Sequence, residues 1–330
     1  KCPKLTRPPY VCNGCQDKRC CTLEKCIYDA SSAQVEYSSV LAEARQGIAV
    51  SDEEKKRLND IISPLILKGQ SLHHICLNHM DELMVSERTL YAYMDAGLFT
   101  AKNIDMPRKV RFRPRRKRPD TINVDPKCRE GRTLDDYKKY MSEHPDTPVV
   151  QLDSVEGIKG GAVLLTVTFP SAGLQLAFRR DHNDAQSVIN IFDRMYLELG
   201  PDTFIKLFPV LLADNGSEFS DPERIEFDAN ENRRSRMFYC NASAPYQKGS
   251  CEAHHEMIRR VIHKGVDITP YTQAQITLMM DHINSYRRNT LANKSPYEVF
   301  GFLYGGDVLK RSGLSLIPPD EIVLSPELLK

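Results

Sequence analysis

Three acidic residues stand where their carboxylates could bind metal ions. Asp214 directly follows a short apolar run in the stretch LLADNGSEFS, Asp153 lies inside the β-rich run TPVVQLDSVEG, and Glu252 begins the helical stretch SCEAHHEMIRR. Mg²⁺ prefers oxygen ligands and binds through a few carboxylates together with substrate phosphates and water. Two such ions about 3.5–4 Å apart can activate an attacking oxygen and stabilise a leaving one in phosphoryl transfer.

These carboxylates can do such chemistry only if the fold brings them together. An Asp after a buried strand is otherwise an ordinary loop residue. Three carboxylates clustered without a metal would repel one another and raise one another's pKa, so a purely structural triad would be costly. The sequence therefore favours a site for Mg²⁺ or Mn²⁺ at Asp153, Asp214 and Glu252.

The elements that must position this site follow one another in the second half of the chain. Two β-rich runs separated by the turn residues PSAG predict hairpins with the run that holds Asp153. Residues 209–213 are wholly apolar, which is typical of a central strand flanked by helices. The predicted strands are 147–157, 160–170, 174–180, 209–213 and 236–241, and the predicted helices are 184–199, 250–263, 272–289 and 295–303.

Three strands, a helix, two strands and then helices is the order of a ribonuclease-H-like α/β fold. In that order Asp153 and Asp214 would lie at adjacent strand ends. The motif ADNGSEF, between QLDSVEG and APYQKGSCEAHHEMIRR, resembles the catalytic core of DDE transposases and retroviral-type integrases. More narrowly, the chain resembles bacterial insertion-sequence transposases of the IS-thirty family. This likeness extends to RPPYVCNGC, SERTLYAYMDAGLF, NIDMPRKVRFRPRRK and NSYRRNTLANKSPYEVF.

The resemblance implies an enzyme that cuts the ends of a mobile element and joins the freed 3′-hydroxyl to target DNA. It makes Asp153, Asp214 and Glu252 the catalytic triad. Two residues depart from the family pattern, since Ala213 and Ser154 stand where Thr is more frequent. Neither position carries a ligand, so the implied activity is kept.

A cluster of cysteines near the start of the chain predicts a second metal site. Six of the ten cysteines lie within the first 26 residues, and Cys12 and Cys15 form a CxxC pair with Gly14 in its turn. No secretory signal precedes them, so Zn²⁺ is favoured over disulfides. The preferred ligands are Cys2, Cys12, Cys15 and Cys21, while Cys20 and Cys26 are alternatives to the last. Free structural cysteines are the other interpretation.

Residues 52–99 predict short helices that could bind DNA. Ser63 followed by Pro64 indicates a helix start, Ser71 and Ser86 are further N-caps, and Gly97 suits a C-terminal cap. Two short helices, the second with a polar and aromatic outer face, resemble a helix-turn-helix. The alternative is a small helical packing domain. On the second helix the predicted DNA contacts are Arg88, Tyr91 and Tyr93.

A basic arm follows these helices. Eight of the 14 residues in MPRKVRFRPRRKRP are Lys or Arg. The whole chain has a net charge of only +1, but residues 1–118 carry 21 Lys or Arg against 14 Asp or Glu. Such a segment favours phosphate contacts or a minor groove over an unpartnered linker. The predicted contacts are Arg108, Lys109, Arg111, Arg113, Arg115, Arg116, Lys117 and Arg118, joined by Lys248, Arg259 and Arg260 around the helix of Glu252.

These observations predict five segments. They are a Cys-rich zinc segment at 1–50, a helix-turn-helix domain at 51–102, a basic arm and linker at 103–145, the catalytic core at 146–304 and a C-terminal tail at 305–330. Double-stranded DNA is the expected partner, and a dimer or higher oligomer is expected on it. Because the chain begins at Lys1 without Met, an upstream segment is expected.

No apolar run approaches the roughly 20 residues that span a bilayer. The resemblance implies a bacterial, cytoplasmic and nucleoid-associated location. Two other functions compete with the transposase. One is a ribonuclease-H-like nuclease that makes no strand transfer, and the other is a repressor-like DNA-binding protein with a non-catalytic core.

Overall fold

The computed structural model describes residues 2–44, 50–107, 126–241 and 249–330, and at 43, 44, 126 and 249–253 it describes the backbone alone. The chain divides into two compact units, Lys1–Glu54 and Lys55–Lys330. Within the described residues no helix is both long and apolar enough to cross a membrane.

The Cys-rich unit contains the 3₁₀ turn η1 (Pro3–Thr6) and the helix α1 (Ala30–Ala44). Between them the chain folds back on itself. The Asn13 amide donates to the Tyr28 carbonyl and accepts from the Tyr28 N–H, both at 2.7 Å, and the Cys12 N–H donates to the Cys26 carbonyl at 2.5 Å. The helix α1 was not among the predicted elements.

Four helices follow: α2 (Asp52–Leu67), which begins three residues before the second unit, α3 (Leu72–Asn78), α4 (Met80–Leu83) and α5 (Glu87–Asp95), with η2 (Asn103–Asp105) after them. The Ser71 and Ser86 hydroxyls accept from the N–H groups of His74 and Thr89, as predicted for N-caps. Gly97 has φ +72°, which confirms its place just past α5.

The predicted helix start at Ser63 and Pro64 is wrong, because α2 runs through both residues. Leu58 and Ile62 before the proline and Ile66 after it are all fully buried in one apolar cluster. This packing offsets the backbone hydrogen bond that a proline removes inside a helix. The Ser63 hydroxyl donates to the Asn59 side chain and accepts from the Ala101 N–H instead of capping.

A five-stranded mixed sheet forms the centre of the remaining chain. Its strands are β1 (Val149–Glu156), β2 (Val163–Phe169), β3 (Leu174–Arg180), β4 (Val210–Ala213) and β5 (Arg236–Tyr239), in the order β3-β2-β1-β4-β5. The first three strands are antiparallel, while β4 lies parallel to β1 and β5 parallel to β4. All five lie where the sequence predicted strands. Along the chain, three strands are followed by a helix and then by two more strands, as predicted for a ribonuclease-H-like core.

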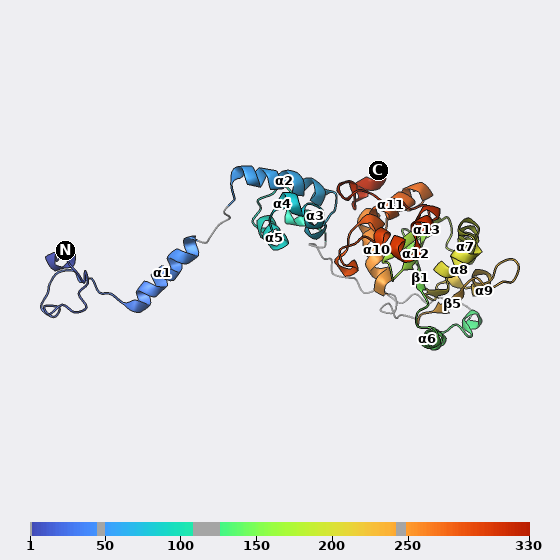
Figure 1. Ribbon diagram of the computed structural model, residues 1–330, viewed down its shortest axis with the longest axis horizontal. Coiled ribbons are helices and arrows are strands. Elements are labelled where there is room, and N and C mark those ends of the chain that lie inside the picture. Colours follow the sequence, from blue (N-terminus) through green and yellow to red (C-terminus); the bar gives the residue numbers. More distant parts are fainter. Residues whose placement is uncertain (1, 45–49, 108–125, 242–248) are drawn as a thin grey trace. The chain divides into compact units, whose positions relative to one another are not determined.

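Helices cover the sheet (Figure 1): α10 (Gly249–Val261) packs against β1, while α11 (Gln273–Ser285) and α12 (Pro296–Tyr304) pack against β3. The main apolar cluster takes Leu211 and Ala213 from β4, whereas Val210 and Leu212 belong to a second cluster with Phe238. The helices and 3₁₀ turns around the sheet are η3 (Pro126–Arg129), α6 (Leu134–Glu143), α7 (Ala185–Leu199), α8 (Pro201–Leu207), η4 (Ser217–Phe219), α9 (Pro222–Glu226), α10 (Gly249–Val261), α11 (Gln273–Ser285), η6 (Asn289–Leu291) and α12 (Pro296–Tyr304).

The C-terminal segment packs on α11. It contains α13 (Gly306–Arg311), η7 (Pro319–Glu321) and η8 (Pro326–Leu329). The Asp281 carboxylate accepts from the Ser315 N–H at 2.9 Å, and the His282 ring accepts from the Val323 N–H at 3.1 Å. The segment predicted as a tail is therefore part of the folded core.

Candidate active site

The parallel pairing of β1 and β4 places Asp153 beside Asp214. Val149 pairs with Val210 and Gln151 pairs with Leu212. The same register carried two residues further sets Asp153 opposite Asp214, just past the last paired residues. Because neighbouring strands lie about 4.7–4.9 Å apart, this register puts the two positions abreast, with Asp153 inside β1 and Asp214 directly after the end of β4.

The turn after β4 is fixed by its own side chains. The Asp214 carboxylate accepts from the Gly216 N–H at 3.1 Å, and the Asn215 amide donates to the Cys240 carbonyl, just beyond β5, at 2.9 Å. Gly216 leaves room for the buried Glu218, whose carboxylate oxygen would lie 2.2 Å from a Cβ at position 216. The sequence DNGSE therefore builds a tight turn that orients Asp214.

Asp153 is linked to the helix that carries the third predicted ligand. His255 of α10 lies with Nδ1 3.9 Å from the Asp153 carboxylate and with Nε2 2.9 Å from the Thr166 hydroxyl. Thr166 faces Asp153 across β1 and β2 and donates its hydroxyl to the Asp153 carbonyl at 3.1 Å. The first turns of α10 therefore lie against the end of β1.

The side chain of Glu252 lies outside the described part of the structure. Its backbone belongs to α10, three residues before His255, and residues three apart share one face of a helix. Position 252 thus lies on the face of α10 that meets β1. The place of Glu252 in the triad stays a prediction.

The donor chemistry suits a hard divalent cation. Two carboxylates stand abreast, and a third acidic residue lies on the adjoining helix face, which matches the oxygen ligands that Mg²⁺ and Mn²⁺ take in proteins. Among the side chains that the structure describes, no three His, Cys, Asp or Glu residues already form a metal-binding group.

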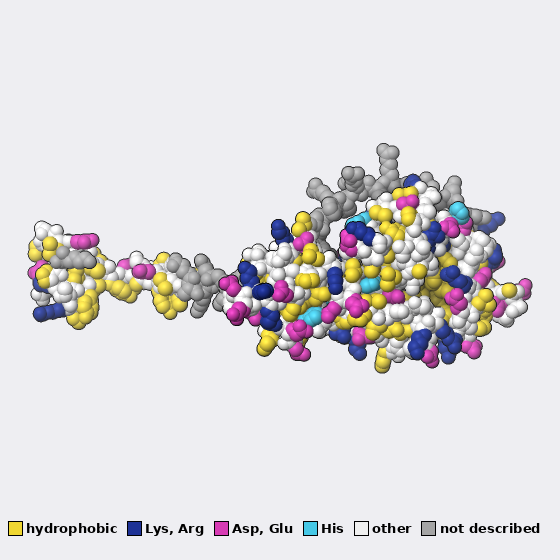
Figure 2. Space-filling model, turned by 90° about the horizontal axis from the view of Figure 1, so that it is seen from above, with side chains coloured by type: hydrophobic (Ala, Val, Ile, Leu, Met, Phe, Trp, Pro, Cys, Tyr) yellow, Lys and Arg dark blue, Asp and Glu magenta, His cyan; other side chains and the backbone are white. Residues whose placement is uncertain are grey.

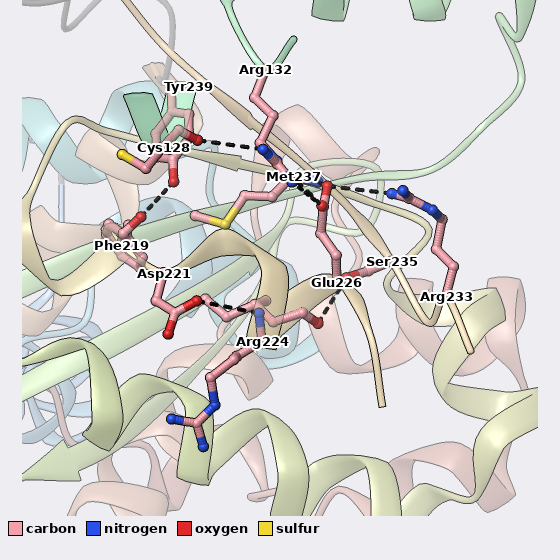
Figure 3. A network of polar contacts seen from close by, with 11 residues as sticks. Cys128, Arg132, Phe219, Asp221, Arg224, Glu226, Arg233, Ser235, Met237 and Tyr239 are labelled. Carbon is pink, nitrogen blue, oxygen red and sulfur yellow. Dashed lines mark hydrogen bonds and ion pairs between the residues drawn. The ribbon is translucent and has the colours of Figure 1, made fainter. Parts of the chain in front are cut away.

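A buried carboxylate holds the segment before β1 against β5 (Figure 3). Glu226, with a side chain only 4% exposed, accepts from Arg132 Nε at 3.2 Å and Nη2 at 2.8 Å, and from the Met237 N–H at 2.8 Å. Burial lowers the pKa of Arg132, but the hydrogen bond and charge of Glu226 outweigh it and raise the pKa overall. Arg233 lies 3.5 Å from the other carboxylate oxygen.

The predicted zinc ligands lie in the first unit. Cys2, Cys12, Cys15 and Cys21 are partly exposed, whereas Cys20 and Cys26 are exposed. Cys2, Cys12 and Cys15 line one cleft of about 410 Å³, which does not include Cys21. Cys26 does not line this cleft either, and among the described residues no three of these cysteines already form a metal-binding group. The zinc site stays a prediction.

The predicted DNA contacts occupy different environments. Arg88 and Tyr91 are exposed on α5, and Tyr93 is partly buried against Phe99. On α10 the Arg259 side chain donates to the Glu156 carbonyl at 2.7 Å, and burial lowers its pKa, while Arg260 lies 3.9 Å from Glu256. The basic-arm residues Arg108 to Arg118 and Lys248 lie outside the described residues.

Surface charge alone does not locate a DNA-binding face. On the face in Figure 2, Lys and Arg side chains are interspersed with Asp and Glu over the described residues. The helix α5 itself carries Glu87, whose carboxylate lies 2.9 Å from the His73 ring. The DNA-contact residues therefore remain predictions.

Sequence reasoning missed the contacts that support the two aspartates. Arg129 donates from Nη2 to the Asn215 carbonyl at 3.3 Å, and Arg180, which is buried, donates to the hydroxyl of Ser154 at 2.9 Å. Burial lowers the pKa of Arg180. Neither arginine belongs to a motif, so only the three-dimensional structure shows that they adjoin the site.

Comparison with known proteins supports the resemblance. A probable transposase for the insertion-like sequence element IS1161 of Streptococcus salivarius is 25% identical over 286 residues, which are 86% of this chain and 76% of that protein. The chain is therefore similar in sequence to a bacterial insertion-sequence transposase over most of its length. The transposase InsI for the insertion sequence element IS30C of Escherichia coli K12 is 26% identical over 147 residues, 44% of this chain and 36% of that protein.

Two further comparisons add detail. The transposase for the insertion sequence element IS1086 of Cupriavidus metallidurans is 33% identical over 64 residues, 19% of each chain. The catalytic core domain of BIV integrase is similar in structure over 47% of this chain and 93% of that core, with a TM-score of 0.34 and 20% identity. No protein-family model matches the sequence.

Proposed function

We propose that this chain is a DNA transposase that cuts element ends and joins them to target DNA by phosphoryl transfer. The observation that carries the proposal is the register of β1 and β4, which sets Asp153 opposite Asp214. The relationship to insertion-sequence transposases supports the same conclusion. Glu252, on the adjoining face of α10, completes the proposed triad.

Each residue of the proposed site has a defined task. Asp153, Asp214 and Glu252 would hold Mg²⁺ or Mn²⁺, and the metal, when bound, would stabilise the attacking and leaving oxygens of an in-line displacement. The Gly216 N–H orients the Asp214 carboxylate, and His255 with Thr166 orients Asp153. Water would be the nucleophile for cleavage and the freed 3′-hydroxyl the nucleophile for joining, so no protein side chain bonds to DNA covalently.

The experiment follows both products on a labelled duplex that carries an end of the element, together with a target duplex. Mg²⁺, Mn²⁺ and EDTA are compared for the wild type, Asp214→Asn and Glu252→Gln. Glu256→Gln is the matched control, since Glu256 lies on the same helix, one turn beyond Glu252. The proposal predicts nicked and joined products that depend on metal and vanish in the two triad variants alone.

Two other outcomes identify the competing functions. Metal-dependent nicks without any joined product would indicate a nuclease that lacks strand transfer. Tight DNA binding by a folded protein that neither cuts nor joins under any metal would indicate a DNA-binding protein with a non-catalytic core. The Cys-rich unit has its own test, because bound Zn²⁺ is measured by metal analysis of the purified protein and is expected to fall when Cys12 and Cys15 are replaced.

A further inference from the structure

The turn that carries Asp214 is held from outside by one arginine. Arg129 is the last residue of η3, and its Nη2 donates to the carbonyl of Asn215, 86 residues later in the chain. Asn215 directly follows Asp214. The Asn215 side chain in turn donates to the Cys240 carbonyl. The peptide that follows Asp214 is therefore tied both to the segment before β1 and to the end of β5.

The surroundings of Arg129 restrict where its guanidinium can go. The guanidinium carbon lies 5.8 Å from the centre of the Tyr239 ring, and Tyr239 is almost fully buried. The Tyr239 hydroxyl donates to the Phe219 carbonyl, at the far end of the turn that begins with Asp214. Arg129 and Tyr239 thus hold the two ends of the same short loop.

The position of Arg129 also reduces the stability of the folded protein. Its Nε is buried and makes no hydrogen bond to any described atom. A buried donor without a partner destabilises the folded protein. The neighbouring Arg132 shows what a purely structural arginine looks like in this segment, because its donors reach Glu226 and the Cys128 carbonyl.

We propose that Arg129 is a positioning residue that holds the Asp214 carboxylate in its metal-binding orientation. This inference rests on the proposed function, since it assigns Asp214 to a metal. Groups that orient metal ligands typically change metal affinity by roughly 10–100-fold when they are removed. A Lys at this position would keep the positive charge and one donor but lose the planar geometry of the guanidinium.

The test measures Mn²⁺ binding by water-proton relaxation and, separately, the Mg²⁺ dependence of DNA cleavage. Asp214→Asn defines the part of the binding that belongs to this site. Arg129→Gln is expected to weaken Mn²⁺ binding by roughly 10-fold or more and to lower kcat with little change in the KM for DNA. Arg129→Lys is expected to recover part of both effects. Arg132→Gln is the matched control and should lower the melting temperature without altering Mn²⁺ affinity.

Wild-type Mn²⁺ affinity in a folded Arg129→Gln protein would overturn the inference, as would an equal loss of affinity in Arg132→Gln. If Arg129→Gln does not fold, the comparison of Arg129→Lys with Arg132→Gln decides by the same criterion. A wild-type protein that binds Mn²⁺ through Asp214 yet neither cuts nor joins DNA would contradict the proposed function, while the binding data would still decide the role of Arg129.

Discussion

Replacing Glu226 by Ala should destabilise the core far more than its position on a short helix suggests. The carboxylate is 4% exposed and accepts from Arg132 Nε and Nη2 and from the Met237 N–H. Removing one partner of a buried ion pair costs about 3–5 kcal/mol, because the other charge stays buried without compensation. Arg132 is only 18% exposed, so solvent replaces little of what it loses.

The two arginines that contact Glu226 should differ in how much stability is lost when each is replaced. Arg132→Gln leaves the buried carboxylate short of two hydrogen bonds, so it should cost about 2–4 kcal/mol. Arg233 lies 3.5 Å from Glu226 with a side chain 38% exposed, and Arg233→Gln should therefore cost less than about 1 kcal/mol. The small effect of Arg233→Gln should shrink further in high salt.

Urea unfolding followed by far-ultraviolet circular dichroism measures these differences, since the chain contains no Trp for fluorescence. A double-mutant cycle between Arg132→Gln and Glu226→Gln isolates the coupling of the pair. The reasoning would be refuted if Glu226→Ala stayed within about 1 kcal/mol of the wild type, or if Arg233→Gln cost as much as Arg132→Gln.

Three further substitutions test other parts of the structure. Gly216→Ala should slow metal-dependent cleavage and lower the melting temperature slightly, because the new Cβ would force the Glu218 carboxylate, the end of a flexible side chain, to move. Burial raises the pKa of Asp281 from 3.8, the ordinary value of an Asp side chain, to about 6. Above pH 3.8 the carboxyl group therefore ionises more readily in the unfolded chain, which destabilises the folded protein. Asp281→Asn should therefore add up to about 3 kcal/mol of stability at pH 8 and almost none below pH 3.8 in urea unfolding. Ser86→Ala should destabilise α5 by about 1 kcal/mol in thermal unfolding, since Thr89 loses its cap.

The sequence predicted the elements whose signal is local. The runs around Asp153 and Asp214 are rich in β-branched and apolar residues, and all five strands lie inside the predicted ranges. The predicted helix 184–199 corresponds to α7, which Asp184 caps. The register of β1 and β4 was not predicted, because the relative position of two strands distant in the sequence has no local signal.

The missed features depend on partners distant in the chain. Pro64 lies inside α2 because apolar packing overrides a local signal for a helix start. The short helices α8 and α9 begin at Pro201 and Pro222, where turn residues concealed them. Arg259 meets a carbonyl 103 residues away, which spacing along one helix cannot indicate.

The most direct test of the central claim is whether one metal contact links Asp214 to the scissile phosphate. Cleavage of a duplex with sulfur in place of the 3′-bridging oxygen at the cleavage site is measured for the wild type and for Asp214→Asn, in Mg²⁺ and in Mn²⁺. Our account predicts that Mg²⁺ supports little cleavage of the sulfur duplex, that the softer Mn²⁺ restores it, and that Asp214→Asn shows no cleavage with either ion. Equal rates with both ions, or an Asp214→Asn variant that cuts as fast as the wild type, would contradict it.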